Sequence, residues 1–110
     1  DHANFLYANH LFKNRKYRNA IKIYEDINTS YLNEEEQIEC KYKQGYCYYQ
    51  TQDIEKASEI FKEISKQNSL YQEDAQYYYA HIQYANGNKV EANEIFNKLK
   101  KSKKYKPKVK

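Results

Sequence analysis

The chain has 110 residues, a formal net charge of +4, and a composition that is 40% hydrophobic and 16% aromatic, with tyrosine as the main aromatic residue. Its two Gly and one Pro supply little material for tight β-turns, so the composition excludes a sheet of hairpins and predicts an all-α protein with one small core. No apolar run approaches the roughly 20 residues that span a membrane, so no membrane-spanning helix is expected in this segment.

Apolar residues recur at helical spacing in six stretches, which short polar breaks divide into three pairs. The stretches are 5–12 and 17–27, 42–49 and 54–64, and 77–84 and 90–99. The breaks read KNRK, QTQD and ANGN. Asp53 is placed to cap the helix after the second break, and Gly87 can take the left-handed conformation that ends a helix. The sequence therefore predicts six helices.

One pattern occurs three times: a small residue, an alanine twelve positions later, an aromatic residue four positions further, and an aliphatic residue three beyond that. The sets are Ala8, Ala20, Tyr24, Ile27; Gly45, Ala57, Phe61, Ile64; and Ala80, Ala92, Phe96, Leu99. The alanines are 37 and 35 positions apart, and such a period indicates a solenoid of stacked helix pairs. Small side chains let the helices of a pair approach closely, so Ala57→Leu should cost about 1 to 3 kcal/mol.

These residues resemble tetratricopeptide repeats. The resemblance is carried by NFLYANHLFKNRKYRNAIKIYEDI, KYKQGYCYYQTQDIEKASEIFKEI and QYYYAHIQYANGNKVEANEIFNKL, which follow in register. It implies a right-handed α-solenoid of three antiparallel helix pairs in a single domain, with repeats at about 2–28, 36–66 and 73–100. The chain departs from the family's pattern in two ways. The family's usual Trp is replaced in the three repeats by Asn4, Lys41 and Gln76. In the third repeat, Gln83 and Lys89 stand where interior aromatic or aliphatic residues are usual.

The charge is uneven along the chain. Residues 100–110 hold seven Lys and no acid, which leaves twelve basic and fifteen acidic residues in 1–99. The stretches between repeats are similar to linkers of bacterial multi-repeat and envelope-associated members, so 101–110 is expected to be a basic linker toward a fourth repeat. Pro107 is then expected near the first turn of the next helix, where its missing N–H is harmless. Because the chain opens on Asp without an initiator Met, we expect a fragment of a larger multi-repeat protein. Its compartment, the cytoplasm or a bacterial periplasm or envelope, stays open.

By the same resemblance, the first helix of each pair lines a concave groove. The groove residues are Phe5, Asn9, Phe12, Tyr42, Tyr46, Tyr49, Tyr77, His81 and Tyr84, with His2, Glu39 and Asp74 at one rim. Seven of these nine groove residues are aromatic, and with an acidic rim they suit an extended or helical peptide that carries apolar anchors and some positive charge. The alternative is that some of these rings only pack on their neighbours.

One subset of the family binds a C-terminal carboxylate through Lys, Asn and Arg side chains in this groove. Only Asn9 matches that set, while Lys43, Tyr46, Asp74 and Tyr78 occupy or adjoin the other places. Asp74 would repel a carboxylate, so a clamp for chaperone tails is disfavoured.

Among function classes, the residues and the resemblance favour a non-catalytic scaffold that binds a protein or peptide partner without cofactor or metal. The open ends of the solenoid could also self-associate. The alternative is a nucleic-acid-binding helical repeat that uses the tail and a basic cluster, Lys13, Arg15, Lys16, Arg18 and Lys22. An enzyme is disfavoured because the sequence shows no carboxylate pair, nucleophile with a base, or phosphate loop.

The cysteines and histidines show no chemical pattern of their own. Cys40 and Cys47 lie on one predicted helix, about 10 Å apart along its axis, so they cannot form a disulfide with each other. Together with the scattered His2, His10 and His81 they lack the spacing of a zinc site. We expect both cysteines to be small, buried hydrophobic residues.

Overall fold

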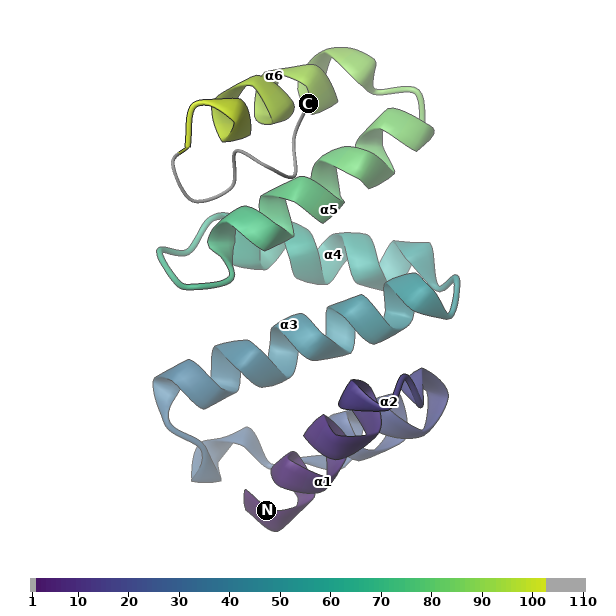
Figure 1. Cartoon of the computed structure of the whole chain (residues 1–110), viewed down its shortest axis with the longest axis vertical. Helices are drawn as coiled ribbons and strands as arrows, with labels where there is room; N and C mark the ends of the chain where they lie inside the picture. Colours follow the sequence, from purple (N-terminus) through teal and green to yellow (C-terminus); the bar gives the residue numbers. More distant parts are fainter. Residues whose placement is uncertain (1, 103–110) are drawn as a thin grey trace. The chain divides into compact units, whose positions relative to one another are not determined.

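The computed structural model describes residues 2–102, and all regular secondary structure in that part of the chain is helical (Figure 1). The elements are α1 (His2–Lys13), α2 (Tyr17–Asp26), the 3-10 helix η1 (Thr29–Tyr31), α3 (Glu34–Gln50), α4 (Ile54–Ser65), α5 (Gln72–Ala85) and α6 (Lys89–Lys100). Each predicted apolar stretch falls on one α-helix, which confirms the all-α class with six helices. Residues 103–110 of the predicted linker, including Pro107, lie outside the described residues.

The chain forms two compact units, Asp1–Ile60 and Phe61–Lys110, which are described one at a time. In the first unit, α2 packs against both α1 and α3. In the second unit, α5 packs against α6. The right-handed solenoid that the resemblance implies stays a prediction.

The turn within each helix pair has the same backbone design. Its third residue has a positive φ, as predicted for Gly87 at 94°, but the equivalent residues are Arg15 at 62° and Gln52 at 70°. The next residue donates its N–H to the carbonyl five positions earlier, which is the Schellman arrangement that ends a helix. The three bonds are Lys16 to Leu11 at 2.8 Å, Asp53 to Tyr48 at 2.8 Å and Asn88 to Gln83 at 2.9 Å.

The small residues of the repeated pattern are all buried, as the need for close helix packing predicts. They are Ala8, Ala20, Gly45, Ala57, Ala80 and Ala92. In the first unit, Ala8 and Ala20 belong to the packed helices α1 and α2. In the second unit, Ala80 and Ala92 belong to the packed helices α5 and α6. A larger side chain at these sites in α1 and α2, or in α5 and α6, would therefore have to displace a neighbouring helix.

The first unit has a core in which α1, α2 and α3 all take part. Phe5 comes from α1, Tyr24 from α2, and Cys40 and Cys47 from α3. Both cysteines carry free thiols in the interior, which confirms their expected role as small hydrophobic residues. Burial is the main cause that raises the pKa of Cys40 to about 11 and that of Cys47 to about 12.

The start of α3 is fixed by a capping box that the sequence analysis did not identify. The Asn33 side chain accepts from the Glu36 backbone N–H at 2.9 Å, and the Glu36 carboxylate accepts from the Asn33 N–H at 3.1 Å. Each side chain thus satisfies a backbone donor that the helix itself leaves unpaired. The spacing of Asn and Glu three positions apart, before a helical stretch, was the available signal.

The second unit packs its aromatic rings against the end of α4. Phe61 is fully buried and its ring stacks on Tyr78 of α5, with centroids 5.4 Å apart. Gln76, which stands in the family's usual Trp position, donates to the backbone carbonyl of Ser65 at 3.2 Å, and Gln72 donates to the same carbonyl at 3.2 Å. Both amides therefore satisfy a carbonyl at the C-terminus of α4 that has no partner within the helix.

Candidate functional site

In the first unit, three aromatic rings meet around the turn between α1 and α2. Phe12 lies 5.8 Å from Tyr17 and 5.5 Å from Tyr46, and the two tyrosine rings are 5.8 Å apart. The Lys43 ammonium lies over the Phe12 ring at 5.3 Å from its centroid, a cation–π contact. Phe12 and Tyr46 were predicted groove residues, so the structure brings these two together from α1 and α3.

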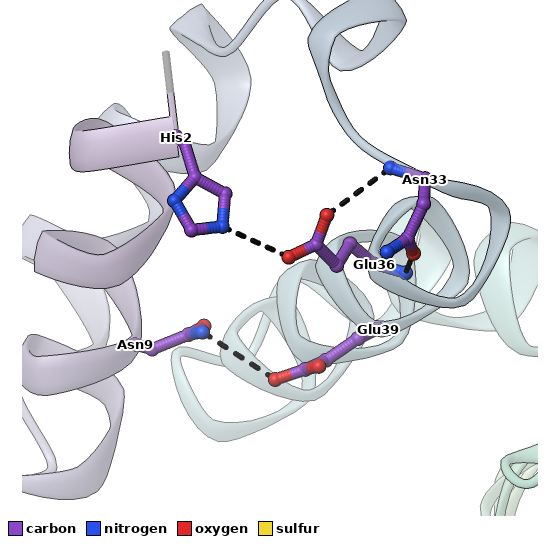
Figure 2. Close-up of polar contacts among 5 residues, drawn as sticks. All are labelled: His2, Asn9, Asn33, Glu36 and Glu39. Carbon is purple, nitrogen blue, oxygen red and sulfur yellow. Dashed lines mark hydrogen bonds and ion pairs between the residues drawn. The ribbon is translucent and has the colours of Figure 1, made fainter.

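A polar network joins the three helices of this unit beside those rings. The Tyr24 hydroxyl donates to Asn9 Oδ1 at 2.6 Å, and Asn9 Nδ2 donates to Glu39 at 3.4 Å (Figure 2). Lys43 donates to the same Glu39 carboxylate oxygen at 2.7 Å. The predicted groove residue Asn9 and the predicted rim residue Glu39 are therefore both engaged within the chain.

The rim residue His2 is also engaged, because its Nε2 lies 2.9 Å from a Glu36 carboxylate oxygen (Figure 2). The backbone N–H of Asn33 and then the His2 side chain hold the pKa of Glu36 below its ordinary value. Figure 2 shows His2 reaching from α1 toward Glu36 while Asn33 faces Glu36 from the loop before α3. At this end of the unit, the Glu36 carboxylate therefore takes part both in the capping box of α3 and in a contact with α1.

The remaining predicted groove residues of the first unit differ in exposure. Phe5 is only 3% exposed and packs in the core, so its ring offers almost no surface to a partner. Tyr42 and Tyr49 are half-buried, and each has further contacts within the chain. Of the predicted groove residues on α1 and α3, Phe12 and the α3 tyrosines thus keep accessible aromatic surface and Phe5 does not.

In the second unit, the predicted residues Tyr77 and His81 form part of a ring cluster with Phe96 of α6. Tyr77 lies 4.5 Å from His81, and Phe96 lies 6.1 Å from Tyr77 and 5.2 Å from His81. Partial burial lowers the pKa of His81 below its ordinary value, which favours the neutral ring at neutral pH. Tyr84 is 45% exposed, and the Lys89 ammonium lies over its ring at 5.4 Å.

Three aromatic partners were absent from the predicted groove. They are Tyr17, Tyr78 and Phe96. Tyr78 belongs to the unbroken run of three tyrosines in α5, and that run was the available signal. Tyr17 and Phe96 lie on second helices, which the resemblance places outside the groove, so neither was assigned to it although Phe96 is part of the repeated pattern.

The predicted basic cluster borders a hollow at the start of α2. The hollow has a volume of about 340 Å³ and is lined by Arg15, Lys16, Tyr17, Arg18, Asn19, Gln50 and Thr51. The first turn of α2 carries no acidic residue, and Lys16 makes no side-chain cap. Positive side chains and the positive end of the helix dipole therefore face the same region.

Among residues 2–102, no three His, Cys, Asp or Glu side chains gather in a way that could hold a metal ion. Within the same residues, no helix combines the length and the apolar character needed to cross a membrane.

Comparison with known proteins assigns the chain through its repeats. The family model for the tetratricopeptide repeat matches residues 39–69 and 74–102, which together make up more than half of the chain. The first match falls on α3 and α4, and the second on α5 and α6. Searches of curated proteins and of solved structures gave no match. The two family matches fall on two helix pairs that share the same turn and the same buried small residues, so the chain belongs to the tetratricopeptide repeat family.

Proposed function

We propose that this chain is a non-catalytic module that binds a peptide segment of a partner protein through aromatic side chains on the first helix of each pair. Tetratricopeptide repeats are generally protein–protein interaction modules, and membership of the family supports the scaffold role. The observation that supports the finer proposal is the contact between the Phe12 ring of α1 and the Tyr46 ring of α3, whose centroids are 5.5 Å apart. The Tyr17 ring of the second helix α2 packs against both of them at 5.8 Å.

Aromatic rings of this kind suit recognition because they offer large apolar faces at a low cost in side-chain entropy. They are held in place by one another and by Lys43, so little ordering is needed when a ligand binds. The carboxylates of Glu36 and Glu39 already pair with His2 and Lys43. Apolar anchors on the peptide should therefore contribute more to affinity at this unit than positive charge does.

The second unit offers its own surface, at Tyr77, His81 and Tyr84. The exposed Tyr84 ring and the neutral His81 ring can both contact apolar or aromatic side chains of a ligand. We propose that this surface contributes to the same kind of peptide recognition. The proposal therefore concerns one surface on each unit, and the two surfaces can be tested independently.

The test is affinity capture with the whole chain, followed by measurement of the dissociation constant for the identified partner peptide. Tyr46→Ala in the first unit and Tyr77→Ala in the second should each weaken binding by about tenfold or more, as truncated aromatic anchors do. Tyr31→Ala is the matched control, because Tyr31 is 71% exposed and lies outside both surfaces. Equal affinity in both groove variants and the control would move the binding site elsewhere.

A second candidate function is nucleic-acid binding, and the basic hollow at the start of α2 is the observation that favours it. Arg15, Lys16 and Arg18 line that hollow together with the Tyr17 ring. Titration with a single-stranded oligonucleotide should then show binding that weakens steeply with salt and with the charge reversal Arg18→Glu. Absence of binding at low salt would remove this candidate.

A further inference from the structure

One face of α1 exposes apolar side chains, whereas most of the equivalent positions in other helices of the chain are buried. Ala3, Leu6, Tyr7 and His10 follow one another at helical spacing, and all four are exposed. Leu6 is 55% exposed and Tyr7 is 53% exposed, which is high for large apolar residues on a structured helix. We call these four residues the open face of α1.

The repeat period shows what normally covers this face. In α3, 37 positions later, the equivalents of Ala3 and His10 are Cys40 and Cys47, which are buried in one cluster with Tyr24 of α2. In α3, therefore, the packed neighbour α2 helps to bury the equivalents of Ala3 and His10, while the equivalents of Leu6 and Tyr7 are the half-buried polar residues Lys43 and Gln44.

The second unit repeats this arrangement in α5. There the equivalents of the open face are Ala75, Tyr78, Tyr79 and Ile82. Three of them are buried, and Tyr78 stacks on Phe61 of α4. At equivalent positions, two helices of this chain thus meet the second helix of another pair, whereas residues 2–102 supply no such helix to α1.

The end of the open face near Lys13 is bordered by positive charge. From His2 to Tyr24 the sequence contains five Lys or Arg residues and no Asp or Glu, whereas acidic residues come at the end of α2, as Glu25 and Asp26, and beside His2, where Glu36 pairs with its ring. Lys13 continues the open face by one turn beyond His10, and Arg15 and Lys16 follow in the adjoining turn. A partner that covers the apolar part of this face would therefore meet positive charge at its edge.

We propose that the open face of α1 binds an acidic amphipathic helix of a partner protein. The helix would pack apolar residues against Leu6 and Tyr7, as α2 packs Tyr24 against α3, and would place carboxylates opposite Lys13. The small Ala3 side chain allows the two helices to approach closely. This interaction uses residues outside the proposed groove, so it stands or falls separately from the proposed function.

The experiment uses the full chain and a short capped peptide with Leu on one helical face and Glu on the others. Fluorescence anisotropy should detect binding, and Leu6→Asn combined with Tyr7→Asn should weaken it by about tenfold or more. Leu70→Asn is the matched control, since Leu70 is 74% exposed and lies in the second unit. A peptide with Lys in place of Glu should bind more weakly to the wild type and should gain affinity for Lys13→Glu.

Four outcomes would overturn the proposal. The first is equal binding to the wild type and to the Leu6 and Tyr7 double variant when circular dichroism shows both to be folded. The second is equal binding of the Glu and Lys peptides. The third is a dimer in sedimentation that Leu6→Asn dissociates, because a second copy of the chain would then cover the face. Loss of binding in Tyr46→Ala or Tyr77→Ala would point to the groove instead.

Discussion

The pair of positions filled by Asn9 and Tyr24 in the first unit is filled by His81 and Phe96 in the second. In the first unit the contact is a hydrogen bond of 2.6 Å from the Tyr24 hydroxyl to Asn9. In the second unit it is an aromatic contact, with the His81 and Phe96 ring centroids 5.2 Å apart. In these two units the same repeat positions are in contact, but the contact is a hydrogen bond in one and an aromatic contact in the other. Repeats with the same backbone can consequently present different surfaces.

The largest effect is expected from Phe61→Ala, which tests whether aromatic contacts hold the second unit together. Phe61 is fully buried and stacks on Tyr78, so its removal leaves a cavity and should destabilise the chain by about 3 to 5 kcal/mol. Denaturant unfolding followed by circular dichroism gives the value. Phe61→Leu, which keeps most of the volume, should cost much less, and equal losses in both variants would contradict a packing role for the ring.

The next test asks whether the close helix contacts are equivalent in the two units. Ala20→Leu and Ala92→Leu place the same larger side chain at equivalent, fully buried positions, and each should cost about 1 to 3 kcal/mol. Thermal unfolding of both variants measures the effect. An unchanged melting temperature in either variant would show that its helix pair does not need the small residue.

A smaller loss of stability is expected when the hydrogen bond between Tyr24 and Asn9 is replaced by the kind of contact that His81 and Phe96 make. Tyr24→Phe removes the donor to Asn9 Oδ1 and should cost about 1 to 2 kcal/mol. Asn9→His combined with Tyr24→Phe recreates the pair found in the second unit and should recover part of that loss. A double-mutant cycle gives the coupling energy, and strict additivity would mean that the two positions do not interact.

The smallest effects concern the three turns. Gly87→Ala places a side chain on a backbone with φ of 94° where no atom lies within 4 Å of the new Cβ, so the cost of about 1 kcal/mol is conformational only. Gln52→Gly relieves the same strain and should change stability in the opposite direction, by less than about 1 kcal/mol. Denaturation midpoints of the two variants that shift in the same direction would show that the turns are not equivalent.

The sequence was sufficient for features that depend on local periodicity. The helices, the buried alanines and the left-handed Gly87 follow from spacing and residue type. Arg15 and Gln52 were not predicted to be left-handed, because neither side chain favours that conformation and the turn imposes it.

The candidate site was harder to predict than the helices. The pairing of Lys43 with Glu39 follows an i, i+4 spacing and could have been found from the sequence. The bond between Tyr24 and Asn9 and the burial of Phe5 depend on how α1, α2 and α3 pack together. Such contacts join residues far apart in the chain, so no local pattern carries them.

The two cysteines on α3 give the chain a built-in reporter of its own motion. With a pKa of about 11, only on the order of one Cys40 thiol in ten thousand is ionised at neutral pH, and burial keeps reagents away from both sulfurs. Alkylation or oxidation therefore has to wait until α3 leaves its neighbours. The rate at which the two cysteines are labelled therefore reports the free energy needed to move α3 away from its neighbours, and no engineered probe is required.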